Sequence, residues 1–301
     1  MNQMATCLNE LKSSKGSHSV ILGLLLLLLS SLSWSGVKAQ TLTNDLLNLD
    51  ATHPDSVTSI SLKGRGLEAF PLELLQFRNL RSLDLSGNNI SELPSELTQF
   101  SQLQYLDISK NDLRQLPASF SALKKLNTVF LGGNKSLDID QTIKAIAEAN
   151  IEVLDLRNDN INTLPADIAK LKKLKKLNLS GNPISQLPPS LTLLENLEVL
   201  YLNNDPYFDI DANVKTLEGL RNLQELHLEE DGLKMIPEAL LQLENLQYLY
   251  LNKNLLTQIP KQMESYETLR YLDISGNPLP RLEIEGLENR LAPTLKINFG
   301  N

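Results

Sequence analysis

The sequence predicts an α/β solenoid, in which one short structural unit is repeated along the chain. A phrase of the form L-x-x-L-x-L-x-x-N/D begins at nine places with a nearly constant spacing, and two copies are slightly lengthened. A period of about 23 residues indicates units that bury their apolar sides against one another. The copies begin at Leu80, Leu103, Leu126, Ile151, Leu174, Leu197, Leu223, Leu246 and Leu269, and a weaker copy begins at Val57.

Residues 80–102 show how one repeat is expected to fold. Leu83 and Leu85 alternate with polar residues, which predicts a short strand with both leucines turned inward. Asn88 follows in a turn, where its side-chain amide can satisfy backbone groups of the adjoining coil. Pro94 is expected at the first position of a helical turn, because its fixed φ suits that position.

A Leu-Pro or Ile-Pro pair recurs at the same place in the plain repeats, at 93–94, 116–117, 164–165, 187–188, 236–237 and 259–260. This pattern resembles the leucine-rich repeat proteins, in the subclass of Ras-suppressor-like, plant intracellular and bacterial secreted members, over about residues 57–299. The resemblance implies a curved horseshoe with a parallel sheet on the concave face and short helices or 3-10 turns on the convex face. It also implies binding of other macromolecules, although a fold alone does not fix a function.

The segment 1–39 has the organisation of a signal peptide. Lys12 and Lys15 precede an apolar run at residues 20–29, and small residues follow as far as Ala39. The run is too short to span a bilayer, which takes about twenty apolar residues. We therefore expect cleavage after Ala39, no transmembrane span in the mature chain, and a secreted, periplasmic or cell-surface location. A retained anchor is the alternative.

The rest of the chain is predicted to be one elongated domain with modified ends. Residues 40–56 are expected to form an N-terminal cap, residues 57–291 about ten repeats, and residues 292–301 a capping strand. Arg65 occupies the turn position that later repeats give to Asn or Asp, which fits a degenerate terminal repeat.

That turn position is predicted to form a buried ladder along the solenoid, one residue in each repeat. Asp can accept hydrogen bonds as Asn does, so the three Asp substitutions are expected to be mild. The ladder consists of Asn88, Asn111, Asn134, Asp159, Asn182, Asp205, Asp231, Asn254 and Asn277.

The two lengthened repeats are alike, which indicates duplication of a unit of three repeats. Both lack Leu-Pro, both carry a similar Asp-containing segment, at 137–140 and at 208–211, and residues 282–285 resemble a third, eroded copy. Apolar residues at helical spacing predict a fuller helix in each, capped by Asp140 and Asp211. The alternative is calcium binding by the pairs Asp138 with Asp140 and Asp209 with Asp211.

Strand residues predicted to face outward change in character along the chain. The later strands gather tyrosines and a histidine, which are favoured in binding interfaces, can also stack on sugar rings, and equally suit any strand surface. A metal held by the histidine and its neighbouring glutamates would lack further ligands. The candidate ligand-binding patch is Tyr201, Glu225, His227, Glu229, Tyr248, Tyr250 and Tyr271.

Composition excludes several function classes. A formal net charge of -8 disfavours nucleic-acid binding. The sequence contains no G-x-S-x-G hydrolase motif, no H-E-x-x-H zinc-protease motif and no nucleotide-binding P-loop, so we expect no enzyme and no cofactor. The lysine-rich stretch at residues 170–176 is expected to be a solvated edge, with an anionic partner as the alternative. The sequence thus predicts an exported, non-enzymatic module that binds a protein through its concave face. The alternatives are a glycan-binding protein and an adhesive or structural cell-surface protein.

Overall fold

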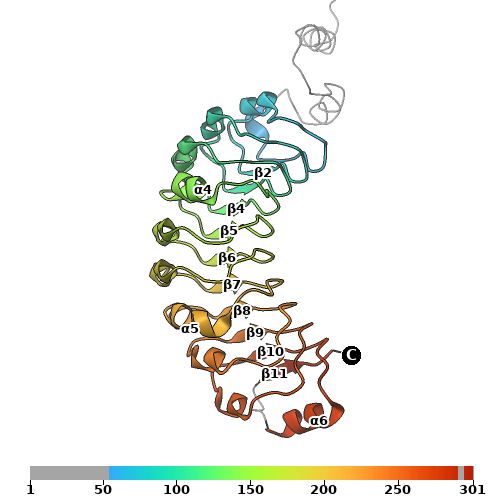
Figure 1. The fold of residues 1–301 in the computed structure, drawn as a ribbon. Helices are drawn as coiled ribbons and strands as arrows, with labels where there is room; N and C mark the ends of the chain where they lie inside the picture. Colours follow the sequence, from blue (N-terminus) through green and yellow to red (C-terminus); the bar gives the residue numbers. More distant parts are fainter. Residues whose placement is uncertain (1–53, 291–294, 301) are drawn as a thin grey trace, which may run out of the picture. The chain divides into compact units, whose positions relative to one another are not determined.

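The computed structural model describes residues 54–290 and 295–300, and these residues build one continuous sheet (Figure 1). Eleven parallel strands follow one another in sequence order. Each strand has three residues: β1 Ser59–Ser61, β2 Ser82–Asp84, β3 Tyr105–Asp107, β4 Thr128–Phe130, β5 Val153–Asp155, β6 Lys176–Asn178, β7 Val199–Tyr201, β8 Glu225–His227, β9 Tyr248–Tyr250, β10 Tyr271–Asp273 and β11 Lys296–Asn298. The predicted signal peptide and residues 40–53 of the predicted N-terminal cap lie outside the described residues.

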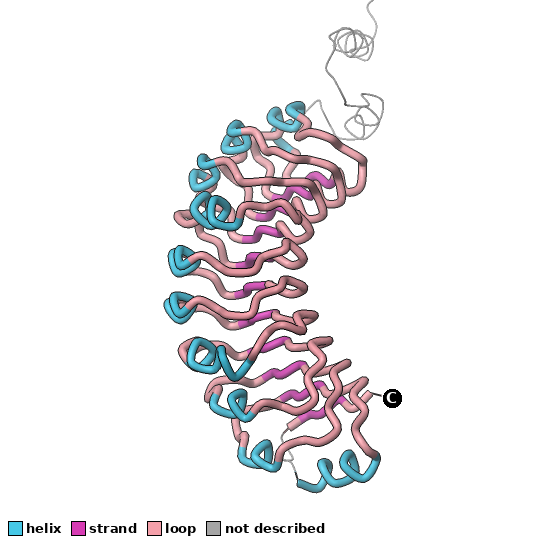
Figure 2. The backbone as a smooth tube through the Cα atoms, viewed as in Figure 1, coloured by secondary structure: helices cyan, strands magenta, loops and turns pink. Residues whose placement is uncertain are grey.

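Most of the short helices lie on the side opposite the sheet, and the repeats curve with the sheet on the inner, concave side (Figure 2). Helix α6, Arg281–Arg290, lies apart from them at the C-terminal end of the repeats (Figure 1). The 3-10 helices are η1 Pro54–Ser56, η2 Leu72–Gln76, η3 Ser95–Gln99, η4 Ala118–Ala122, η5 Ala166–Lys170, η6 Pro189–Leu193, η7 Glu238–Gln242 and η8 Lys261–Ser265, and the α-helices are α4 Ile139–Ile146, α5 Ile210–Glu218 and α6 Arg281–Arg290. The predicted fold class is confirmed. None of the helices in the described ranges is long and apolar enough to cross a membrane.

The strand register places equivalent residues of successive repeats side by side. Leu83 of β2 pairs with Leu106 of β3, and both are fully buried. Full burial of such a side chain contributes about 2 kcal/mol. Phe77, Phe100 and Phe120 add the largest fully buried side chains, on the helix side of the core. The inward positions therefore build one continuous apolar core along the repeats.

The predicted place of proline was wrong by one position. Pro94 lies before η3 as its N-cap, with φ -72° and ψ 149°, so the helical turn begins at Ser95. The extended ψ lets the carbonyl of Pro94 accept the Leu97 N–H at 3.2 Å, which closes the first turn. Every other 3-10 helix that follows a Leu-Pro or Ile-Pro pair begins in the same way.

The asparagine ladder joins neighbouring repeats through side-chain amides. Asn88 Oδ1 accepts the N–H groups of Arg65 and Leu67 at 2.8 and 3.0 Å. Its Nδ2 donates to the carbonyls of Leu62 and Leu85 at 3.0 and 2.7 Å. Eight of the nine ladder residues are buried and Asn277 is half-buried, so the predicted ladder is confirmed.

Two of the three Asp substitutions are not mild, contrary to prediction. Oδ2 of Asp159 and Oδ2 of Asp231 are buried without a hydrogen-bond partner among the described residues, because a carboxylate cannot donate as the Asn Nδ2 does. Burial raises the pKa of each carboxyl to about 7. Asp205 differs, since its two oxygens accept the N–H groups of Ile184 and Tyr207.

The lengthened repeats carry α-helices, as predicted. Helices α4, α5 and α6 begin at Ile139, Ile210 and Arg281, which are equally spaced along the chain. Their predicted caps were wrong: Asp138 Oδ1 accepts the Gln141 N–H and Asp209 Oδ1 accepts the Ala212 N–H, each at 3.0 Å. The capping residue must keep a non-helical backbone, and these residues do so at the end of an extended segment. Asp140 and Asp211 lie inside the first helical turn.

Candidate ligand-binding face

The last residue of each strand contributes to one row along the concave face, which we call the strand-end row. In the C-terminal half, β7, β8 and β9 place Tyr201 beside His227 and His227 beside Tyr250. Asp273 of β10 pairs with Tyr250. Adjacent strands are about 4.8 Å apart, so large side chains at these positions must pack against one another.

Four rings of this region form a continuous stack, which we call the ring column: Tyr201, His227, Tyr250 and Tyr271. The His227 centroid lies 4.1 Å from Tyr201 and 4.1 Å from Tyr250, with interplanar angles of 23° and 4°. Tyr271 meets Tyr250 in a tilted contact at 5.4 Å. Both faces of the imidazole are thus covered by phenol rings.

The imidazole of His227 is also held at both of its nitrogens. Nε2 lies 2.8 Å from Glu225 Oε1, and Nδ1 lies 2.9 Å from Glu229 Oε1. The His227 residue is only 8% exposed. The prediction of an exposed histidine was therefore wrong. The strand position faces outward as expected, but two stacked rings and two carboxylates exclude water from it.

Burial, and after it the nearby carboxylates, raise the pKa of the tyrosine hydroxyls. Burial raises the pKa of Tyr250 to about 12, and the charge of Glu225 adds to this shift. Burial, followed by Glu225 and Glu229, raises the pKa of Tyr201. Burial and Asp273 likewise raise the pKa of Tyr271. These hydroxyls stay neutral at physiological pH and remain able to donate hydrogen bonds.

The structure brings all seven predicted patch residues onto four neighbouring strands or their immediate ends, in two unequal groups. Tyr201, Glu225, His227, Glu229, Tyr250 and Tyr271 are linked by ring contacts and hydrogen bonds. Tyr248 pairs with Glu225 and Tyr271 in the first residues of the strands and is 38% exposed. Among the described residues, no group of three His, Cys, Asp or Glu side chains is arranged to hold a metal.

Sequence reasoning missed how aspartates of the strand-end row are held. Asp84, Asp107 and Asp273 each accept, through Oδ1, the N–H and hydroxyl of the serine two positions later. Serine follows at the same spacing in all three, so the recurring D-x-S could have indicated this turn. Asp155 instead bridges Arg157 at 2.8 Å, and Asn178 accepts the Ser180 N–H.

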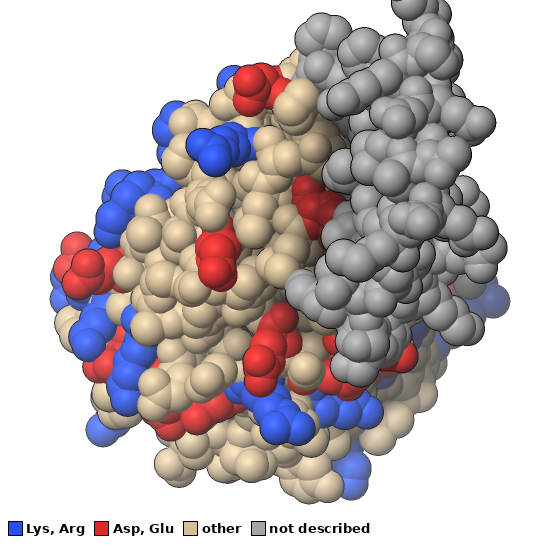
Figure 3. Space-filling model, turned by 90° about the horizontal axis from the view of Figure 1, so that it is seen from above, with Lys and Arg blue, Asp and Glu red and all other residues tan. Residues whose placement is uncertain are grey.

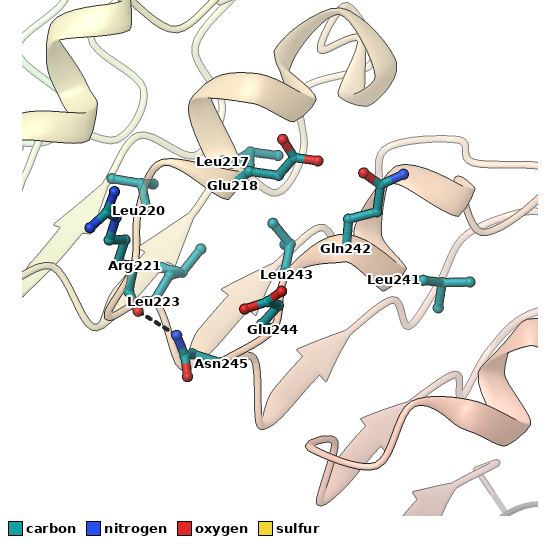
Figure 4. Close-up of a pocket in the computed structure, with 10 residues that line it drawn as sticks. All are labelled: Leu217, Glu218, Leu220, Arg221, Leu223, Leu241, Gln242, Leu243, Glu244 and Asn245. Atoms are coloured by element: carbon teal, nitrogen blue, oxygen red, sulfur yellow. Dashed lines mark hydrogen bonds between the residues drawn. The ribbon is translucent and has the colours of Figure 1, made fainter.

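The helix side carries different features. A hollow of about 630 Å³ lies between α5 and η7, lined by apolar residues such as Leu217 and Leu220 and by Glu218 and Arg221 (Figure 4). Asn245 donates to the Arg221 carbonyl at its edge, at 2.6 Å. Seen from above, basic side chains lie along the flank that carries the helices, interspersed with acidic ones (Figure 3). The ring column belongs to the opposite, sheet side.

Comparisons with known proteins agree with this architecture. The model of the leucine-rich repeat family matches residues 78–135, 149–206 and 216–279. No curated protein matches the chain. A solved internalin from Listeria monocytogenes is 18% identical with a TM-score of 0.64, over 87% of this chain and 75% of that one. A chain of the Toll–Spätzle complex from Drosophila is 25% identical with a TM-score of 0.60, over 77% of this chain but only 31% of that one.

Proposed function

Because the chain belongs to the leucine-rich repeat family, we propose that it is an exported, non-enzymatic recognition module that binds a protein partner through the concave face of β7 to β10. Repeat proteins of this kind commonly use extended concave surfaces for binding. In this proposal residues 1–39 direct export and are removed after Ala39. Residues 40–56 and 292–301 close the two ends of the repeats at 57–291.

The ring column is the observation that carries the proposal. Tyrosines are enriched among the residues that dominate interface energies, and they cluster near interface centres. Here the strands hold three tyrosines in fixed contact, so little side-chain entropy remains to be lost on binding. The Toll structure is a complex with Spätzle, which is a precedent for a chain of this fold in a complex.

The same stack limits sugar binding by ring stacking at Tyr250. A sugar needs a free aromatic face, but Tyr250 places one face against His227 and also meets Tyr271, and Tyr201 has one face against His227. Strand side chains stand roughly perpendicular to the sheet, so the column presents ring edges and hydroxyl groups. Edges and hydroxyls suit the polar and apolar mixture of a protein surface.

Affinity capture with the purified protein from an extracellular extract tests the proposal. We expect the double variant Tyr201→Ala, Tyr250→Ala to bind the captured protein at least about thirtyfold more weakly, since interface anchors contribute about 2 kcal/mol or more. Tyr207→Ala is the matched control, because Tyr207 is 71% exposed but lies in the turn before α5. Unchanged affinity of a folded double variant would show that the partner binds elsewhere.

A further inference from the structure

The strand-end row is rich in acidic and aromatic side chains. Four of its eleven residues are Asp, four are aromatic or His, and within the described strands none is Lys or Arg, although the chain holds 28 of these. The row runs Ser61, Asp84, Asp107, Phe130, Asp155, Asn178, Tyr201, His227, Tyr250, Asp273 and Asn298. Asp84 and Asp107 are half-buried and lie N-terminal to the ring column. Asp155 and Asp273 are buried, and Asp273 pairs with Tyr250 of the ring column.

Cations neutralise only part of this row. Arg157 is bridged to the row residue Asp155 at 2.8 Å, whereas Asp84, Asp107 and Asp273 form no ion pair among the described residues, and Lys253 is bridged to Glu230 at 2.8 Å. Around His227, two carboxylates share one imidazole. At Asp273, burial acts to raise the pKa, but hydrogen bonds from Ser275 and Asn298 outweigh it, so the pKa is lowered and the group is ionised near neutral pH.

From this charge complementarity we infer that the partner presents a basic, arginine- or lysine-bearing segment to the strand-end row. The inference rests on the proposed function and adds the chemistry of the partner. A guanidinium can donate to more than one carboxylate at a time through its planar set of N–H groups, so a row of carboxylates suits arginine best. From Asp84 to Asp273 the row extends roughly 38 Å, given strand spacings of about 4.8 Å, which suits an extended segment.

The structure itself supplies a substitution that removes charge without disturbing the turn. Asn178 occupies the same row and accepts the Ser180 N–H at 3.0 Å, as Asp84, Asp107 and Asp273 do for their serines at 2.9, 2.9 and 3.0 Å. Replacing these three aspartates by Asn therefore keeps the Oδ1 acceptor. The triple variant Asp84→Asn, Asp107→Asn, Asp273→Asn removes three negative charges from the concave side.

A matched control removes the same charge from the convex side. Glu73, Glu96 and Glu238 lie in the first turns of η2, η3 and η7, and all three are exposed. The control variant Glu73→Gln, Glu96→Gln, Glu238→Gln has the same net charge as the concave variant. Any general attraction between an acidic protein and a basic peptide affects both variants equally.

The probe is a fluorescein-labelled peptide of alternating Arg and Gly, with a Glu and Gly peptide as its counterpart, and anisotropy is read at physiological salt. We expect the Arg peptide to bind about tenfold more weakly to the concave variant and less than about twofold more weakly to the convex variant, since exposed ion pairs contribute up to about 1 kcal/mol each. The inference is overturned if the Arg peptide does not bind the parent protein or if the Glu peptide binds as tightly. It is also overturned if both variants lose the same affinity for the Arg peptide, or if neither variant loses affinity.

The captured partner separates this inference from the proposed function. If the tyrosine double variant loses the partner and the concave aspartate variant retains it with unchanged affinity, the face binds protein but the partner is not basic. If neither variant affects capture, the proposed function itself fails. Loss in both variants, with the convex variant unaffected, supports the two together.

Discussion

The interior ladder and the strand-end row differ in how much they vary, although both place one residue in every repeat. The ladder uses only Asn and Asp in nine positions, because each rung meets the same backbone carbonyls and N–H groups. The strand-end row uses six residue types in eleven positions, because its side chains form different contacts from one repeat to the next. Hydrogen bonding thus fixes the residue type in the interior, while the residue type on the concave face can vary.

Removal of a ladder amide is expected to have the largest effect on stability. Asn182 accepts the N–H groups of Asp159 and Ile161 and donates to the carbonyls of Leu156 and Leu179, all at 2.8 to 3.0 Å. Asn182→Ala leaves these buried groups unpaired and should lower the free energy of unfolding by about 4 kcal/mol in urea titrations. Asn89→Ala, at an exposed turn position, should change it by less than about 0.5 kcal/mol. Similar values for the two variants would mean that the ladder is not the interior constraint.

The Asp residues of the ladder test whether each ladder position requires a hydrogen-bond donor. Asp159 and Asp231 have folded pKa values raised to about 7, above the ordinary value of 3.8, so the folded protein holds protons that the unfolded chain has lost between about pH 4 and pH 7. Their contribution to stability is full below about pH 4 and is lost as the pH rises through 7. Asp155 beside Asp159, and Asp205 and Glu229 beside Asp231, add charges that disfavour ionisation further.

Asparagine at these rungs should remove that pH dependence. We expect Asp159→Asn, Asp231→Asn to be more stable than the parent at pH 8 by about 2 kcal/mol in total, with the difference disappearing toward pH 4. Thermal unfolding at several pH values measures this. Asp205→Asn should not stabilise, because both Asp205 oxygens accept backbone N–H groups. An equal gain in stability from Asn at positions 159, 205 and 231 would show that the missing hydrogen-bond donor is not the cause of the instability at pH 8.

Much of the interior could be predicted from the sequence, because its residues obey the same local rule in every repeat. The period identified the sheet, the ladder and the helices of the lengthened repeats. The errors arose where a neighbour in space decides the outcome. His227 lies at an outward strand position and is nevertheless buried, because Tyr201 and Tyr250 flank it from adjacent strands. Asp159 matches the ladder pattern but lacks a donor for the carbonyls around it.

The helix caps of the lengthened repeats should have a smaller effect than the ladder. Asp138 accepts the Gln141 N–H and Asp209 accepts the Ala212 N–H. Asp138→Ala and Asp209→Ala should each cost about 1 kcal/mol of stability in urea titrations. Asp140→Ala should cost less than about 0.5 kcal/mol, since Asp140 only favours the helix dipole from the first turn. A larger loss of stability for Asp140→Ala than for Asp138→Ala would show that Asp140 is the helix cap.

The smallest effect on stability is expected in the ring column, where Tyr250→Phe removes only a hydroxyl. Phe retains the ring contacts with His227 at 4.1 Å and with Tyr271 at 5.4 Å. The free energy of unfolding should therefore change by less than about 0.5 kcal/mol. Partner binding should nevertheless weaken about fivefold, because the neutral hydroxyl is the group that the column presents. Tyr248→Phe, outside the column, serves as the comparison. Suppose instead that Tyr250→Phe destabilises the protein by more than about 1 kcal/mol and leaves partner binding unchanged. The strand-end row would then have a structural role like that of the ladder, and the contrast between the row and the ladder would disappear.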